Sequence, residues 1–171
     1  HETFHNFGLD FSDMNMTKVN EKILNIFQVN SNVNLFESYT EFWARIINIV
    51  FCSFTNMKDK NNINEFLINS EFFINYERIF SFFQMVKILN FMGLTYNNLY
   101  KKDNLCKKSL YKENSNVLAY YIITLIMINN YNNFLLWCNT NNTELLQFKQ
   151  TAKNLEKYCK FIETNYKSKS M

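Results

Sequence analysis

The sequence contains no proline and only two glycines among its 171 residues. Tight hairpins, bulges and phosphate-cradling loops depend on these two residue types. Their scarcity disfavours all-β sandwiches, dinucleotide-binding folds and collagen-like sequences, and it favours long helices. Alanine is also scarce, whereas asparagine occupies 29 positions, an Asn-rich composition typical of an AT-rich genome such as that of a parasite. Periodicity is therefore a better guide to secondary structure than residue propensity.

Histidine occurs only at positions 1 and 5, so most of the chain has no imidazole for a Ser–His or Cys–His pair. Residues His1 to His5 match the HExxH pattern, in which two histidines bind zinc and the glutamate acts as a base. The match precedes any periodic helix, and the chain has no third histidine. We therefore expect an accidental match, with no metal site, no cofactor and no catalysis.

Cysteines are few and widely separated, without any CxxC pair. This spacing fits neither a zinc ribbon nor a disulfide scaffold. Cys52, Cys138 and Cys159 fall on apolar faces; their disulfide status and that of Cys106 stay open. We favour a reducing compartment, cytoplasmic or nuclear. The chain begins at His1 rather than at methionine, as an excised fragment does, which leaves targeting open.

Hydrophobic runs are too short to span a bilayer. The most apolar run, residues 117–128, has about 12 residues, whereas a span needs about 20. We expect a buried helix there and no membrane span.

Positive charge is concentrated in the second half of the chain. Residues 1–95 carry 7 basic and 10 acidic side chains, and residues 96–171 carry 11 and 5, which gives the net charge of +3. The basic half holds lysine but no arginine, so nucleic acid is not the favoured partner. Two interpretations stay open: solvated lysines, or a patch that meets an acidic protein or peptide partner.

Apolar residues recur at three- and four-residue steps over several segments. This pattern predicts a compact, mainly α domain of five to seven helices over residues 17–171, preceded by an irregular arm at 1–16. The clearest helix spans about residues 34–57. A brief helix follows at 63–67, and Asn69 and Ser70 offer capping oxygens for a second long stripe from Phe72 to Met92. Gly93 suits a left-handed C-cap. A small β-hairpin or short sheet is the alternative near 99–112.

The C-terminal part predicts two further helical segments. A buried helix at 116–129 is followed by an Asn-rich turn and a continuation through Trp137. A capping-box pattern at residues 141–144 predicts the start of the last helix, which runs to Ile162. The aromatic residues of these stripes either form the core or anchor a partner, and the sequence does not separate the two.

One local pattern resembles a known family. The segment Leu67-Ile68-Asn69-Ser70-Glu71-Phe72, and Phe91-Met92-Gly93-Leu94 after it, is similar to the central motifs of the PUB domain, first described in peptide N-glycanase. The resemblance covers about residues 40–128. Met57 stands where the family has proline, and Asn62 where it has an aromatic residue that helps to form a peptide groove.

The resemblance implies a non-catalytic protein–protein interaction module, an adaptor. PUB domains bind the acidic C-terminal tail of a p97-type AAA ATPase in ubiquitin-linked quality control. By position, Asn69, Gly93 and Leu94 would line the peptide-binding groove. Lys101 and Lys102 lie nearby in sequence and would suit an acidic tail.

Two other functions remain open. The chain could be a helical scaffold subunit of a larger assembly, with 116–138 and 142–165 paired as an antiparallel hairpin; a large apolar surface and self-association would favour it. It could instead be an exported or surface helical protein of an AT-rich parasite, which disulfides among the cysteines would favour. The oligomeric state stays open.

Overall fold

Long helices dominate the structure, as the shortage of glycine and proline predicts. The computed structural model describes residues 1–101, 109–168 and 171, and these residues contain no strand. The mainly helical class is confirmed. The elements are α1 (Glu2–Asn6), α2 (Thr17–Ile26), α3 (Leu35–Asn56), α4 (Ile63–Phe91), α5 (Tyr96–Tyr100), the π-helical segment η1 (Leu118–Ile123), α7 (Thr124–Asn129), α8 (Tyr131–Asn141) and α9 (Ala152–Asn165).

Two of the described helices, α1 and α5, were not predicted, because each is too short to show a periodic pattern. Part of the segment proposed as a β-element belongs to α5, which ends at Tyr100. Residues 109–112 form no strand, and 102–108 lie outside the described residues.

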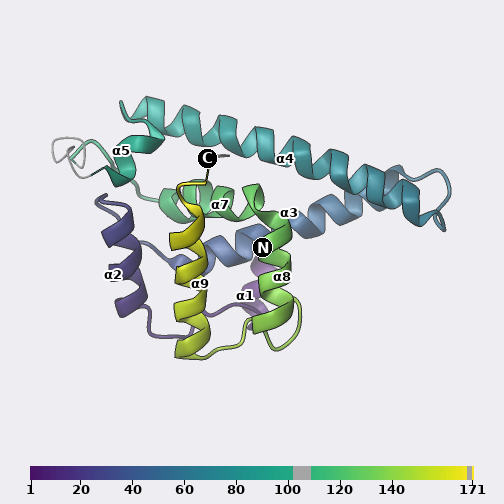
Figure 1. Cartoon of the computed structure of the whole chain (residues 1–171), viewed down its shortest axis with the longest axis horizontal. Helices are drawn as coiled ribbons and strands as arrows, with labels where there is room; N and C mark the ends of the chain where they lie inside the picture. Colours follow the sequence, from purple (N-terminus) through teal and green to yellow (C-terminus); the bar gives the residue numbers. More distant parts are fainter. Residues whose placement is uncertain (102–108, 169–170) are drawn as a thin grey trace.

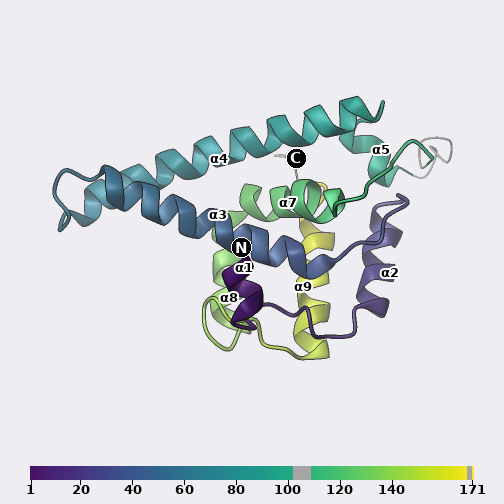
Figure 2. The same cartoon turned by 180° about the vertical axis from the view of Figure 1, so that it is seen from behind.

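Helices α3 and α4 form a long antiparallel hairpin whose tip extends beyond the rest of the protein (Figure 1; Figure 2). The predicted break between two helices near Asn69 is wrong, because α4 runs without interruption from Ile63. The true N-cap is Asn62, whose side-chain oxygen accepts a hydrogen bond from the Glu65 amide at 3.1 Å. Asn69 lies inside the helix and donates to the Ser53 carbonyl across the hairpin.

Gly93 ends α4 as the sequence predicts. Its φ of +70° lies in the left-handed region that favours glycine. The Leu94 amide donates to the Leu89 carbonyl at 2.8 Å, and the Gly93 amide donates to Asn90, which is the Schellman hydrogen-bond pattern.

The core lies at the base of the hairpin. There η1 and α7 contact both α3 and α4, and every residue of α7 is buried. Helices α2, α8 and α9 lie away from the hairpin tip (Figure 1); α8 and α9 contact α7, and α2 packs against α9. Aromatic rings fill the junction: Phe134 of α8 lies 4.6 Å from Phe42 and 5.0 Å from Phe161, measured between ring centroids. No helix of the described residues is long and apolar enough to cross a bilayer.

The first sixteen residues are more ordered than the predicted arm. They contain α1, and both Phe4 and Phe11 are buried. The carboxylate of Asp10, 1% exposed, accepts hydrogen bonds from the Ser12 amide and from the side chains of His5 and Thr40. These bonds explain how a segment without periodicity is fixed against α3.

The last helix begins ten residues later than the capping-box pattern predicts. Residues 142–151 form an irregular loop, and α9 begins at Ala152, after Thr151, whose side chain accepts from the Asn154 amide at 3.2 Å. The loop places Phe148 in the core, and the Phe148 amide donates to the Leu9 carbonyl. Burial of this one ring outweighs the local helix-start signal.

Substitution of Phe134 tests how much the aromatic cluster at the junction of α3, α8 and α9 stabilises the fold. We expect Phe134→Ala to lower the free energy of unfolding by about 3–5 kcal/mol, because a fully buried ring is lost and a cavity remains. Leu136→Ala, two residues further along α8 at a side chain that is 65% exposed, should cost less than about 0.5 kcal/mol. Urea denaturation of both variants measures the difference, and equal losses would contradict the described core.

Candidate functional site

The residues predicted to line one peptide groove lie far apart. Asn69 is near the start of α4 and Gly93 follows its end. At 1.5 Å per residue the two are separated by about 36 Å along the helix axis. Leu94 is buried, Lys101 lies on a different surface beyond α5, and Lys102 is outside the described residues. The described residues therefore do not assemble the predicted groove, because α4 is continuous.

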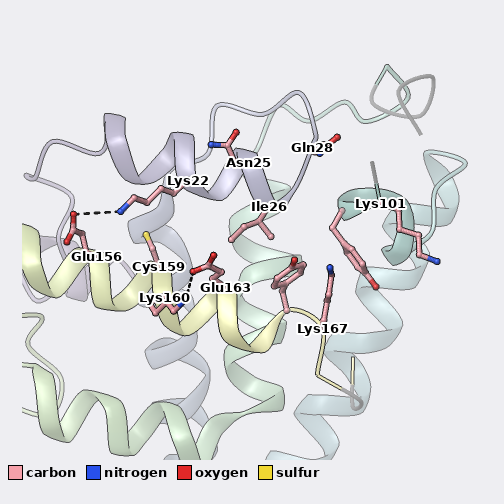
Figure 3. A pocket seen from close by; sticks show the side chains of 12 residues that line it. Lys22, Asn25, Ile26, Gln28, Lys101, Glu156, Cys159, Lys160, Glu163 and Lys167 are labelled. Carbon is pink, nitrogen blue, oxygen red and sulfur yellow. Dashed lines mark hydrogen bonds and ion pairs between the residues drawn. The ribbon is translucent and has the colours of Figure 1, made fainter. Parts of the chain in front are cut away.

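Lys101 instead borders a cleft of about 1050 Å³ lined by α2, α9 and residues around α5 (Figure 3). Four lysines line it together with two glutamates: Lys22, Lys101, Lys160, Lys167, Glu156 and Glu163. Lys22 pairs with Glu156 at 3.7 Å, and Lys160 pairs with Glu163 at 2.9 Å. The cleft thus has a net positive charge from Lys101 and Lys167.

Tyrosines shape one end of this cleft. The Nζ of Lys167 lies 5.1 Å from the ring centroid of Tyr100 and 5.0 Å from that of Tyr166. The two rings meet edge to face. The Tyr96 hydroxyl donates to the Tyr166 carbonyl at 2.7 Å and so ties the end of α9 to α5. Cation–π contacts orient the Lys167 ammonium group without neutralising it, which leaves it available to an anion.

A second surface consists of apolar side chains on the outer face of α4. We name this set the α4 stripe; each member is 58–71% exposed, and the members are Ile68, Phe72, Tyr76, Ile79, Phe83 and Val86. Successive members are three or four residues apart, so they share one face of the helix. The buried residues Ser81, Met85 and Leu89 lie on the opposite face, toward α3 and α7.

The apolar surface extends beyond the α4 stripe. Phe51 and Phe54 are exposed on α3 near the hairpin tip, and Phe91 is 92% exposed at the end of α4. A shallow hollow of about 650 Å³ between α4 and Tyr121 is lined by Phe80, Phe83 and Phe91 among others. Monomeric soluble proteins seldom expose contiguous apolar patches of this extent. Unusually large exposed apolar patches mark interaction sites.

Sequence reasoning found the residues of this surface but not their exposure. Phe72, Tyr76, Ile79 and Phe83 belong to the predicted stripe, for which core and partner surface were both open. The feature that could have separated a core from a partner surface is the presence of apolar residues on all sides of this helix. Such a helix needs more than one neighbour to cover it. The lysine cleft gave no such signal, since its residues come from distant parts of the chain.

The comparisons with known proteins add no assignment. No family model matches the chain, and neither a curated protein nor a solved structure matches it. The PUB resemblance over residues 40–128 stays a prediction.

The reactivity of the cysteines tests whether Cys159, which lines the cleft, is buried. Cys52, Cys138 and Cys159 are free, and burial raises the pKa of the Cys138 and Cys159 thiols to about 12. Only the thiolate is nucleophilic, so at pH 8 we expect iodoacetamide to modify both at least about a hundredfold more slowly in the folded chain than in urea. Half-buried Cys52 serves as the internal control. Mass-spectrometric mapping measures each site, and rapid modification of Cys159 would contradict its burial beneath the cleft.

Proposed function

We propose that this chain is a non-catalytic protein–protein interaction module that assembles with a second copy of itself through the α4 stripe. The observation that carries the proposal is a long helix with an uncovered apolar face. A helix that is apolar on all sides is stable in water only when its faces are covered. Such a surface favours the scaffold subunit that is one of the functions left open by the sequence.

The spacing of the stripe supports another helix as the partner. From Phe72 to Val86 the apolar positions follow the steps four, three, four, three, which is the a/d repeat of a coiled-coil seam. No charged residue belongs to the stripe, so two copies can meet without like-charge repulsion. An antiparallel pair related by a two-fold axis would place Tyr76 beside Ile79 of the second copy and Phe72 beside Phe83 of the second copy.

The area also supports a second copy. At about 200 Å² for a fully exposed large apolar residue, the six members of the stripe expose about 750 Å². A standard stable interface buries about 800 Å² per partner. One α4 stripe against another therefore supplies the area that a specific dimer needs.

We expect the wild-type chain to form dimers whose population rises with concentration, and Ile79→Glu to be monomeric. A glutamate at the centre of the stripe would be buried against apolar residues without a partner, which costs far more than the lost contacts. Leu136→Glu is the matched control, since Leu136 on α8 is similarly exposed but lies off the stripe. Sedimentation equilibrium over a hundredfold concentration range measures all three chains.

A monomeric wild type, or equal dimerisation of both glutamate variants, would overturn the proposal. Binding of the wild-type chain to neutral lipid vesicles without self-association would identify a lipid surface as the partner and would overturn it too. Circular dichroism of Ile79→Glu checks that the helices remain.

The lysine cleft supports a second candidate function, capture of an acidic peptide as the adaptor prediction requires. The supporting observation is the pair Lys101 and Lys167, neither of which has an ion pair among the described residues. A carboxylate there would meet the ammonium group of Lys167 beside the ring of Tyr100, with Lys101 at the border of the cleft. Such complementarity mainly speeds association and sets specificity.

We expect a peptide rich in Asp and Glu with one aromatic residue to bind the wild-type chain, more weakly as salt rises because the charges are exposed. Lys167→Gln should weaken binding severalfold, and Lys149→Gln, outside the cleft, should leave it unchanged. Fluorescence anisotropy of a labelled peptide measures both. Equal effects of the two variants would contradict binding in the cleft.

A further inference from the structure

The two histidines and a glutamate from another helix come together at one point on the surface. His1 is the N-cap of α1 and His5 lies in its last turn, and Glu37 lies in the first turn of α3. The Nε2 atom of His1 is 3.2 Å from Oε2 of Glu37, and the Nε2 atom of His5 is 3.5 Å from the same oxygen. One ligand atom from each of the three residues lies within 4.8 Å of the others.

Hydrogen bonds at Nδ1 fix the orientation of both rings. Nδ1 of His5 donates to Asp10 at 2.5 Å, and Nδ1 of His1 donates to Glu2 at 3.2 Å, because a carboxylate can only accept. In the neutral imidazole the proton is then on Nδ1, and the Nε2 lone pair is free. A carboxylate behind a histidine is the usual outer shell of a metal-bound imidazole.

His1 carries the observation that distinguishes a metal site from a simple ion-pair cluster. Its Nε2 atom is buried and makes no hydrogen bond among the described residues, although Oε2 of Glu37 is 3.2 Å away. A buried polar atom without a partner is costly. Ligand atoms that converge on a shared ion point at the ion and not at one another, which accounts for the short distance without a hydrogen bond.

The separations suit a tetrahedral ion. Zinc bonds of about 2.0–2.1 Å place neighbouring ligand atoms about 3.3–3.4 Å apart, close to the two distances from Glu37. Glu37 is also held in place, since the Tyr120 hydroxyl of η1 donates to Oε2 at 2.7 Å. All three ligands thus have an outer partner: Glu2, Asp10 and Tyr120.

We propose that His1, His5 and Glu37 bind a divalent zinc ion, with water completing the coordination. Two imidazoles and one carboxylate are a ligand set that zinc accepts. The ion would fasten α1 to α3, and through Tyr120 to η1. Glu2 is 86% exposed and contacts Nδ1, the other ring nitrogen of His1, so it is a positioning residue for His1 and not a base beside the metal. The site is separate from the α4 stripe, so each proposal can fail alone.

The test is titration of chelator-treated chain with Zn²⁺ and, separately, with Co²⁺. We expect one zinc per chain by calorimetry. Co²⁺ should give visible d–d absorption without the near-ultraviolet charge-transfer band of a thiolate, because the ligands are nitrogen and oxygen. That spectrum separates this site from binding at Cys52 or at the cysteine outside the described residues.

Variants locate the ion. Glu37→Gln should weaken zinc binding by more than about 100-fold. Tyr120→Phe removes only an outer partner and should weaken it by about 10–100-fold. Glu41→Gln is the matched control, one turn further along α3 and paired with Arg45; its zinc affinity should match the wild type. Far-ultraviolet circular dichroism of each zinc-free variant checks that the fold survives.

Absence of zinc binding by the wild-type chain would overturn the proposal, as would a cobalt spectrum with a thiolate band. Equal affinities of Glu37→Gln and Glu41→Gln would overturn it too. Should Glu37→Gln fail to fold, the Tyr120→Phe titration and the cobalt spectrum decide the question on their own.

Discussion

The structure depends on a difference in length between α4 and the helices that can cover it. Helix α4 has 29 residues and is about 44 Å long, whereas η1 and α7 together have 12 residues and reach about 18 Å. Contact with α3 covers one further side. The remaining face is apolar and faces solvent, because the part of the chain that the structure describes supplies no third helix along it. The hairpin is thus covered on only part of its surface, and the proposed self-association rests on the part that is left uncovered.

A single buried carboxylate organises the opposite end of the molecule. Asp10 joins α1 through His5 to α3 through Thr40, and its backbone carbonyl accepts from Gln150 of the late loop. These bonds hold two irregular segments, separated by about 140 positions in sequence, against one helix. They also orient His5, so the stability of this end and the geometry of the histidine–glutamate cluster have one cause.

The sequence predicts those features that depend on neighbours along the chain. The stripe of α3 and the C-cap at Gly93 follow from three- and four-residue spacing and from backbone freedom at glycine. The start of α9 does not follow from such local features, because burial of Phe148 depends on contact with Leu9 and Phe11, far away in the sequence. The predicted groove required a helix break near Asn69, because only a break would let Asn69 approach Gly93. Helix α4 is continuous there, so the two residues lie far apart. Sequence spacing alone could not show that Glu37 lies beside the two histidines. It also could not show that lysines from distant parts of the chain line one cleft.

Burial decides which polar groups are free to interact outward. Burial raises the pKa of Tyr39, Tyr158 and Cys138, so these groups stay neutral and act as packing and hydrogen-bonding elements of the core. Tyr158 shares a hydrogen bond with Ser38, and Tyr39 donates to the Leu146 carbonyl. The proposals rest instead on groups at three surfaces: the apolar face of α4, two lysines of the cleft, and Nε2 of His1. The three surfaces differ in chemistry, so the partners proposed for them would not compete for one site.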